Sequence, residues 1–147
     1  MSEQGTSGPP DDAAAAWREQ QRATSAAHED RLASRQRMES AAARDLITEF
    51  LHDVRERGPQ PVALRARSYD RRTRYRTPLT GWYLRKDETI AVDTDGKFYI
   101  LTVPSSLAAR FTGVTPVPSE PTLVLGAGGK DGESIDLSVA LARLLDR

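Results

Sequence analysis

Residues 89–103 read TIAVDTDGKFYILTV, and this stretch decides the fold. Two runs within it, Thr89–Val92 and Lys97–Val103, are rich in the β-branched and aromatic residues that favour strands. The residues between them, Asp93–Gly96, have the composition of a type I turn that closes through a glycine at positive φ. The stretch therefore predicts an antiparallel β-hairpin.

The register of this hairpin places apolar residues on both of its faces. Pairing Asp93 with Lys97 puts two apolar pairs on one face, and these pairs are Val92 with Phe98 and Ile90 with Ile100. The other face is also largely apolar: Ala91, Tyr99, Leu101 and Val103. A strand that is apolar on both faces needs cover on both. We therefore expect Lys97–Val103 to be a central strand with other elements packed on each side.

Two further strands are predicted upstream of the hairpin. Residues 62–67 alternate between apolar and polar side chains, which is typical of a half-buried strand. Residues 75–85 are a second candidate, although Pro78 cannot donate a ladder hydrogen bond and marks an edge, a bulge or a break. The simplest topology is a small antiparallel meander of three to five strands.

Helices are predicted on both sides of this sheet in the sequence. The segment Ser40–Arg57 carries an apolar face at helical spacing, formed by Ala43, Leu46, Ile47, Phe50, Leu51 and Val54. A C-terminal helix is indicated by Leu137, Leu141, Leu144 and Leu145. Between sheet and C-terminal helix we expect a helical turn near Leu107–Phe111, a short strand at Thr122–Leu125 and a loop at Gly126–Gly132. The fold class is α+β.

The N-terminal third of the chain differs from the rest. We expect a disordered tail over residues 1–12, a polar Ala/Arg/Glu-rich helical arm over 13–39, and a globular α+β domain over 40–147. One helix over residues 13–57 would be roughly 65–70 Å long at about 1.5 Å per residue. A globule of about 90 residues is only roughly 30 Å across. Either the helix breaks near Arg31–Gln36, or it projects and meets a partner.

The composition excludes several kinds of protein. Lys and Arg number 21 and Asp and Glu number 21, so any preference for nucleic acid must be local. The absence of cysteine excludes disulfides, thiol catalysis and thiolate metal sites. The sequence shows neither a signal-peptide pattern nor a run long enough to cross a bilayer. We therefore expect a cytoplasmic protein with no membrane partner.

The most specific feature is an arginine cluster with interleaved aromatic residues. The candidate binding residues are Arg65, Arg67, Arg71, Arg72, Arg74, Tyr75, Arg76 and Trp82. A four-residue loop at Tyr69–Arg72 would place Arg67 opposite Arg74, and Arg65 opposite Arg76. Like charges directly opposite one another destabilise a sheet and require a counter-charge.

Several sources of counter-charge or relief are open at this point. A nucleic-acid backbone would supply phosphates while the aromatic rings stack on bases, and an acidic partner protein would supply carboxylates. A loop one residue longer would place Arg67 opposite Tyr75 and remove the conflict. Alternatively, the arginines are simply a solvated edge.

No catalytic or metal-binding pattern emerges. The two histidines, His28 and His52, both fall in the predicted helical region and are too far apart to share a metal. The carboxylates Asp87, Glu88, Asp131, Glu133 and Asp136 have no recognisable spacing. Two or more of them in one cleft would favour an enzyme.

The sequence thus predicts a non-catalytic module without cofactor or metal. Its first function hypothesis is protein binding or self-association through the helical arm. The alternative is an accessory nucleic-acid-binding protein that uses the Arg-rich hairpin, residues 65–76.

Overall fold

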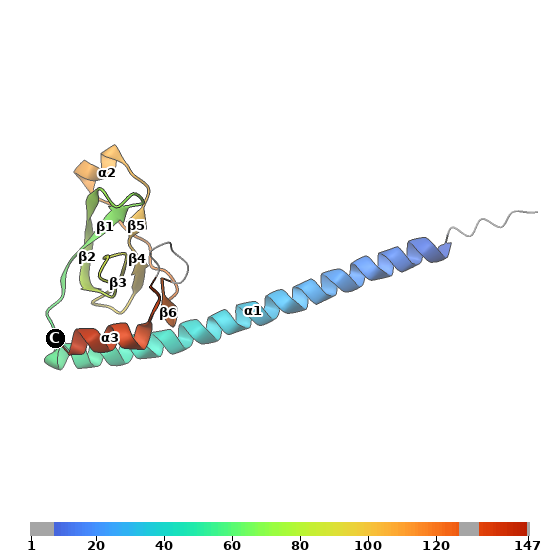
Figure 1. Ribbon diagram of the computed structural model, residues 1–147, viewed down its shortest axis with the longest axis horizontal. Coiled ribbons are helices and arrows are strands. Elements are labelled where there is room, and N and C mark those ends of the chain that lie inside the picture. Colours follow the sequence, from blue (N-terminus) through green and yellow to red (C-terminus); the bar gives the residue numbers. More distant parts are fainter. Residues whose placement is uncertain (1–7, 127–132, 147) are drawn as a thin grey trace, which may run out of the picture. The chain divides into compact units, whose positions relative to one another are not determined.

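The structure is a computed structural model that describes residues 8–126 and 133–146 (Figure 1). The chain divides into two compact units, Met1–Met38 and Glu39–Arg147, and each is described by itself. Parts of the predicted tail (residues 1–7) and of the predicted glycine loop (residues 127–132) lie outside the described residues. No helix of the described residues combines the length and the apolar character needed to cross a membrane.

The second unit is built on a five-stranded sheet. Its strands are β1 (Val62–Ser68), β2 (Arg74–Tyr83), β3 (Ile90–Asp93), β4 (Phe98–Ile100) and β5 (Thr102–Val103). The order in the sheet is β4-β3-β2-β1-β5. The first four strands form an antiparallel meander, and β5 pairs with β1 in parallel. The predicted α+β class and meander are confirmed.

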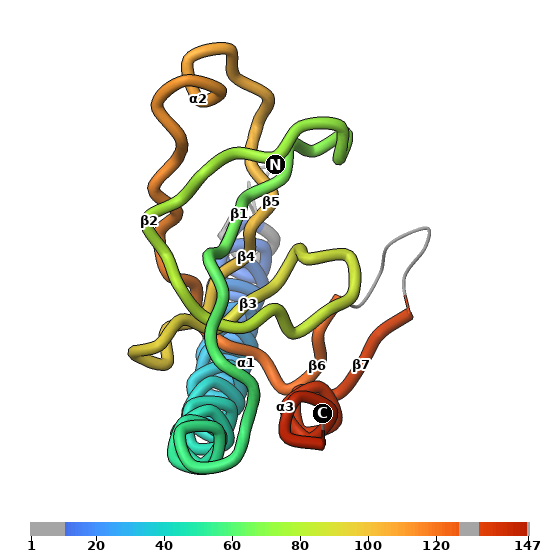
Figure 2. The backbone as a smooth tube through the Cα atoms, turned by 90° about the vertical axis from the view of Figure 1, so that its left-hand side faces the viewer, coloured from blue at the N-terminus to red at the C-terminus, as the bar shows by residue number. Residues whose placement is uncertain are grey.

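The expected single central strand at Lys97–Val103 is wrong. Leu101 interrupts it, so that β4 lies at one end of the strand order and β5 at the other. The N–H of Leu101 donates to the carbonyl of Thr89, and its own carbonyl accepts from Arg67 N–H, both at 2.7 Å. The sheet is therefore rolled until its two ends meet at Leu101, and Figure 2 shows the chain passing from β4 into β5 beside β1.

The hairpin itself has the predicted register. Ile90 lies opposite Ile100, and Val92 lies opposite Phe98. The turn is held by the Asp93 carboxylate, which accepts hydrogen bonds from the N–H groups of Asp95 and Lys97 at 2.9 Å. Gly96 closes the turn with a φ of 87°, a conformation that glycine adopts without steric cost.

The roll explains how both faces of this hairpin are covered. One face lines the inside of the roll, where Leu64, Ala91, Tyr99 and Leu101 form a small cluster. The opposite face packs against two helices through Trp82, Leu84, Ile90, Val92 and Phe98. The prediction that both faces of Lys97–Val103 need cover is confirmed in part: Phe98, Tyr99 and Leu101 are buried, whereas Ile100 is 52% exposed. The partner strand β3 is buried along its whole length.

Both predicted amphipathic helices form this cover. The residues of α1 (Gly8–Arg57) that belong to the second unit bury Ala43, Ile47, Phe50, Leu51 and Val54. The C-terminal helix α3 (Leu137–Leu145) buries Leu137, Ala140, Leu141 and Leu144. A two-stranded sheet of β6 (Val124–Leu125) and β7 (Ile135–Asp136) precedes α3, and α2 (Leu107–Thr112) follows β5.

The residues of α1 in the first unit are helical from Gly8 onward, without a break at Arg31–Gln36. The break that the length argument allowed is therefore absent. The helix also begins before the expected position, Ala13. Pro9 and Pro10 are compatible with this because the N–H groups of the first helical turn have no intrahelical acceptor, so a proline there loses no hydrogen bond.

Candidate binding surface

The loop between β1 and β2 has the four-residue length that creates a charge conflict. Ser68 N–H donates to the Thr73 carbonyl at 3.0 Å, which closes the loop around residues 69–72. The Asp70 carboxylate accepts from the Ser68 hydroxyl at 2.6 Å and from Arg72 N–H at 3.0 Å. These hydrogen bonds hold the pKa of Asp70 below its usual value. Arg71 takes a φ of 62° to complete the loop.

This loop sets the register that the sequence identified as unfavourable. Arg67 lies opposite Arg74, and Arg65 lies opposite Arg76. The alternation of the strands turns these arginines away from the inside of the roll, which receives Leu64 and Ala66 instead. Four guanidinium groups are thereby gathered on one outer face of β1 and β2, and the pairing requires a counter-charge.

The chain supplies that counter-charge itself, from the turn between β2 and β3. The Glu88 carboxylate forms ion pairs with both Arg67, at 2.9 Å, and Arg74. Glu88 has a φ of 61°, an uncommon backbone conformation for a residue with a side chain. Sequence reasoning named Glu88 only as a candidate acid–base carboxylate. Its role as counter-charge was missed because it lies 14 residues beyond Arg74 and meets it only through the fold of the sheet.

Asp87, the neighbour of Glu88, forms ion pairs with a second pair of arginines. Asp87 lies 3.8 Å from the guanidinium of Arg71 and 3.4 Å from that of Arg85. Burial alone would raise the pKa of Asp87, but hydrogen bonds from Thr89 and the charge of Arg85 outweigh it, so the pKa is lowered. Arg85 also donates to the carbonyls of Leu125 and Glu133, at 3.2 and 2.8 Å, and so ties this turn to β6 and β7.

The two aromatic residues of the predicted site lie in the core. Tyr75 is 2% exposed, and its hydroxyl accepts from Ser106 N–H at 3.0 Å. Trp82 donates its indole N–H to the Pro59 carbonyl at 2.9 Å and packs on Phe50. Neither ring is placed to stack on a base. The burial of Tyr75 could have been predicted from the sequence. Tyr75 alternates with Arg74 and Arg76 along the strand, so its side chain faces the opposite side of the sheet.

The six arginines of the predicted site also differ in their surroundings. Arg67, Arg71 and Arg74 pair with Glu88 or Asp87, and Arg76 donates to the Phe111 carbonyl at 3.2 Å. The remaining two, Arg65 and Arg72, are exposed. Residues 65–88 hold eight basic and three acidic residues, a net charge of +5, so the surface stays positive despite its internal ion pairs.

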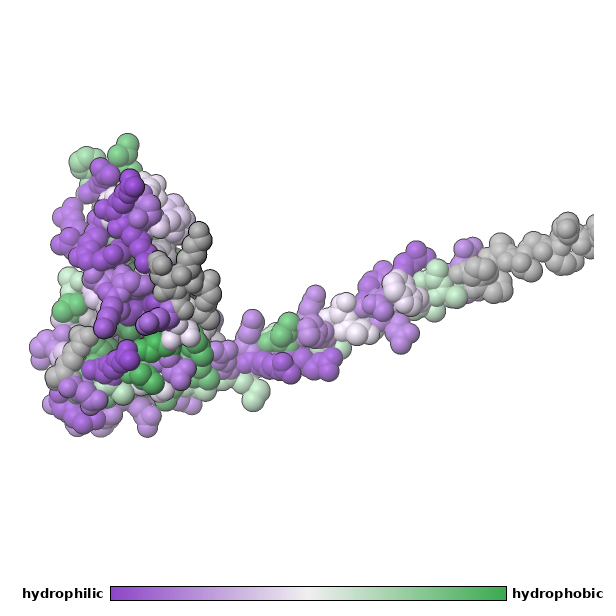
Figure 3. All heavy atoms as spheres, in the orientation of Figure 1, coloured by the Kyte–Doolittle hydropathy of each residue, from purple (hydrophilic) through white to green (hydrophobic). Residues whose placement is uncertain are grey.

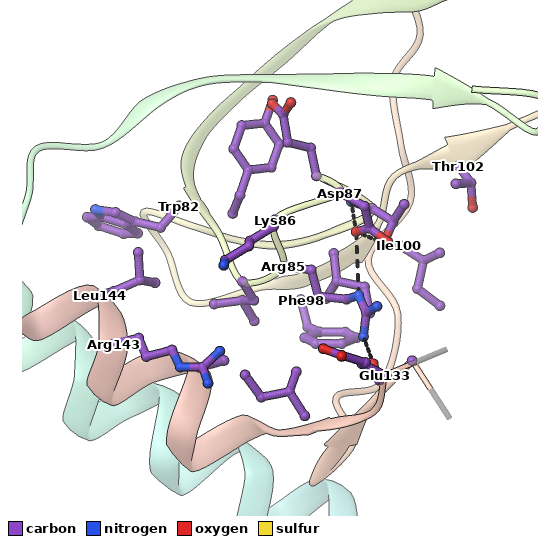
Figure 4. A pocket seen from close by; sticks show the side chains of 18 of the residues that line it. Trp82, Arg85, Lys86, Asp87, Phe98, Ile100, Thr102, Glu133, Arg143 and Leu144 are labelled. Carbon is purple, nitrogen blue, oxygen red and sulfur yellow. Dashed lines mark hydrogen bonds and ion pairs between the residues drawn. The ribbon is translucent and has the colours of Figure 1, made fainter. Parts of the chain in front are cut away.

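One groove brings together three of the carboxylates that the sequence singled out. Asp87, Glu88 and Glu133 all line a groove of about 1610 Å³ between the β2–β3 turn, β6, β7 and α3. Figure 4 shows Arg85 between Asp87 and Glu133. Of these carboxylates, Asp87 has a lowered pKa, and Glu88 forms ion pairs with Arg67 and Arg74. The groove thus meets the condition under which these carboxylates would favour an enzyme.

Comparison with protein-family models, with curated proteins and with solved structures gave no match. The surface must therefore be interpreted from its own chemistry.

The ion pairs of Glu88 lead to a prediction about stability. Glu88→Ala leaves Arg67 opposite Arg74 without their shared carboxylate, and Arg67 Nε is already buried without a hydrogen-bond partner among the described residues. We expect a loss of about 1–3 kcal/mol in the free energy of unfolding. Chemical denaturation measures it.

Two variants serve as controls for this change. Glu88→Gly should cost roughly 1 kcal/mol less than Glu88→Ala, because glycine adopts positive φ freely. Glu120→Ala removes an exposed ion pair to Arg44 and should cost at most about 1 kcal/mol. If Glu88→Ala proved no more damaging than Glu120→Ala, the role of Glu88 as counter-charge would be wrong.

Proposed function

We propose that the protein is a non-catalytic interaction module that associates with a second copy of itself through residues 11–38 of α1. The observation that carries this proposal is the exposure of that segment. Its large apolar side chains, Trp17, Leu32 and Met38, are 63%, 43% and 73% exposed. Tryptophan is on average highly buried in folded proteins, so its exposure here favours a surface that a partner covers.

The stability of this segment also favours a partner. Most helical stability in proteins comes from packing of one face rather than from intrinsic propensity. Within residues 11–38, the side-chain ion pairs and hydrogen bonds of the structure are the Arg22–Glu19 ion pair at 3.9 Å and the Arg37–Ser34 hydrogen bond at 3.1 Å. Contacts of this exposed kind contribute at most about 0.5 kcal/mol each. A second helix packed on Trp17 and Leu32 would contribute more.

The charge pattern of the segment favours its own copy as that partner. Residues 11–17 contain two aspartates and no basic residue, whereas residues 31–38 contain three arginines and no acidic residue. In an antiparallel pair the acidic end of one copy lies beside the basic end of the other. The same arrangement brings Trp17 of one copy near Leu32 of the other. A two-fold axis then forms each contact twice.

Light scattering of the full chain tests this proposal. We expect the wild type to have twice the mass of one chain, and we expect Trp17→Ser with Leu32→Ser to weaken the dimer at least about tenfold, or about 1.4 kcal/mol. Asp11→Lys with Asp12→Lys should weaken it as well. Adding Arg35→Glu and Arg37→Glu to that variant should restore pairing with inverted charges.

A matched control is Val139→Ser, which changes an exposed apolar residue of α3. It should leave the dimer intact. A wild type that stays monomeric at all concentrations would rule out self-association. Loss of the dimer in Val139→Ser would mean that the dimer contact lies outside residues 11–38.

Accessory nucleic-acid binding through residues 65–76 is the second candidate function. It is favoured by the net positive charge of residues 65–88 and by the exposure of Arg65 and Arg72. The test is a binding assay with labelled oligonucleotides that compares the wild type with a variant in which the charges of these two arginines are reversed. Arg67 and Arg74 are unsuitable for it, because they hold Glu88 and their loss would disturb the fold.

A further inference from the structure

The helix α2 presents its large apolar side chains to solvent. Leu107 and Phe111 are 74% and 79% exposed, and their spacing of four residues places them on one side of the helix. The only buried residue of α2 is the small Ala109. This arrangement is the reverse of an ordinary amphipathic helix, in which the large apolar residues face the core.

Hydrogen bonds at both ends of α2 hold it in this orientation. At its start, the Ser106 hydroxyl accepts from Ala109 N–H at 3.2 Å, and Ser106 N–H donates to the buried Tyr75 hydroxyl. At its end, Arg76 donates to the Phe111 carbonyl, and the Arg76 carbonyl accepts from Val114 N–H at 2.8 Å. The outward position of Leu107 and Phe111 is therefore fixed by the fold.

The surroundings of these two side chains are basic. Arg76 contacts the end of the helix, Arg65 lies opposite Arg76 in the sheet, and Arg110 belongs to α2 itself. Between Asp95 and Glu120 the sequence contains no acidic residue. Figure 3 shows hydrophobic atoms at the α2 end of the unit, bordered by hydrophilic ones.

We propose that Leu107 and Phe111, with Arg65, Arg76 and Arg110 around them, form a site that docks on an anionic lipid surface. The apolar side chains enter the boundary between headgroups and acyl chains, and the arginines face the anionic headgroups. This inference is independent of the pairing of residues 11–38, because it concerns a separate part of the chain.

The size of the patch favours a lipid surface over a protein. A standard protein interface buries about 800 Å² on each partner, whereas even a large aromatic side chain such as Phe buries at most about 250 Å². Two protruding side chains on one short helix fall well below that requirement. A lipid interface needs no complementary shape, and each basic residue near it strengthens binding about fivefold.

Sedimentation of the full chain with vesicles tests this site. We expect binding to vesicles of phosphatidylcholine with phosphatidylserine, weakening as salt rises, and no binding to phosphatidylcholine alone. Leu107→Ser with Phe111→Ser should lower binding at least tenfold, and Arg65→Glu with Arg110→Glu should do the same. Matched controls are Val139→Ser and Arg143→Glu on α3, which should bind like the wild type.

Fluorescence tests whether α2 itself enters the lipid. In a Trp17→Phe background, Phe111→Trp places the exposed indole on α2, and its emission should shift to the blue on anionic vesicles. An unchanged emission despite binding would overturn the proposal, as would a wild type that ignores anionic vesicles. The patch would instead be assigned to a protein partner under one combination of results. The wild type would retain a protein that the Leu107→Ser and Phe111→Ser variant loses, and the wild type would not bind vesicles.

Discussion

Gly81→Ala should leave the second unit severely destabilised. Gly81 is buried in β2, where it pairs with Val62 of β1 on one side and with Asp93 of β3 on the other. A Cβ atom at this position would lie 2.6 Å from the Cα of Asp93 and closer still to the Val92 carbonyl oxygen. Both atoms belong to the backbone of a buried strand, so they have no free space into which to move. We expect a loss of at least about 3 kcal/mol in the free energy of unfolding.

Urea denaturation followed by circular dichroism measures this loss. Gly96→Ala is the matched control, because its new Cβ would meet the flexible end of the Leu51 side chain rather than backbone. That variant should cost only about 1–3 kcal/mol, for the strain of a side chain at a φ of 87°. If Gly81→Ala were the milder of the two, the close approach of β2 and β3 at this point would be refuted.

Phe50→Ala should separate α1 from the sheet. Phe50 is 2% exposed and contacts the Trp82 ring edge to face, with the centroids 5.4 Å apart and the planes at 85°. Removing such a ring loses its transfer free energy and leaves a cavity between the helix and β2. We expect a loss of about 3–5 kcal/mol in the free energy of unfolding.

In a Trp17→Phe background, the emission of Trp82 reports on this change, because its environment becomes wetter when Phe50 is removed. The control is His52→Ala on the same helix, whose side chain is 75% exposed. It should alter the free energy of unfolding by less than about 0.5 kcal/mol. Equal effects of the two variants would mean that the buried face of α1 is not the one described.

The parts of this fold that the sequence predicted are those set by neighbouring residues. The turn at Asp93–Gly96 fixes the register of β3 on β4, and the spacing of Ile47, Phe50 and Val54 fixes the buried face of α1. The closure of the sheet was not predicted. Alternation tells which side of a strand is buried, but it does not tell which strand lies beside it. The role of Leu101 therefore appears only when the sheet is rolled.

The candidate binding surface was likewise predictable only in the features that neighbouring residues determine. A four-residue loop at residues 69–72 predicts that Arg67 lies opposite Arg74, and this pairing of like charges requires a counter-charge. The identity of that counter-charge depends on how the β2–β3 turn folds over β1, which local sequence does not determine. The outward position of Leu107 and Phe111 was also missed, because their spacing is equally compatible with a buried helical face.

The roll of the sheet has a consequence for the solubility of the folded chain. An open sheet exposes a row of unpaired N–H and C=O groups along each outer strand, and these groups recruit strands from other molecules into aggregates. Here the two outer strands meet through Leu101, and Phe98 of β4 is bridged by Ser119. Few backbone groups of β4 and β5 are then left to nucleate such growth. The five-stranded sheet therefore offers few such groups at Leu101 and Phe98, even though α2 exposes apolar side chains.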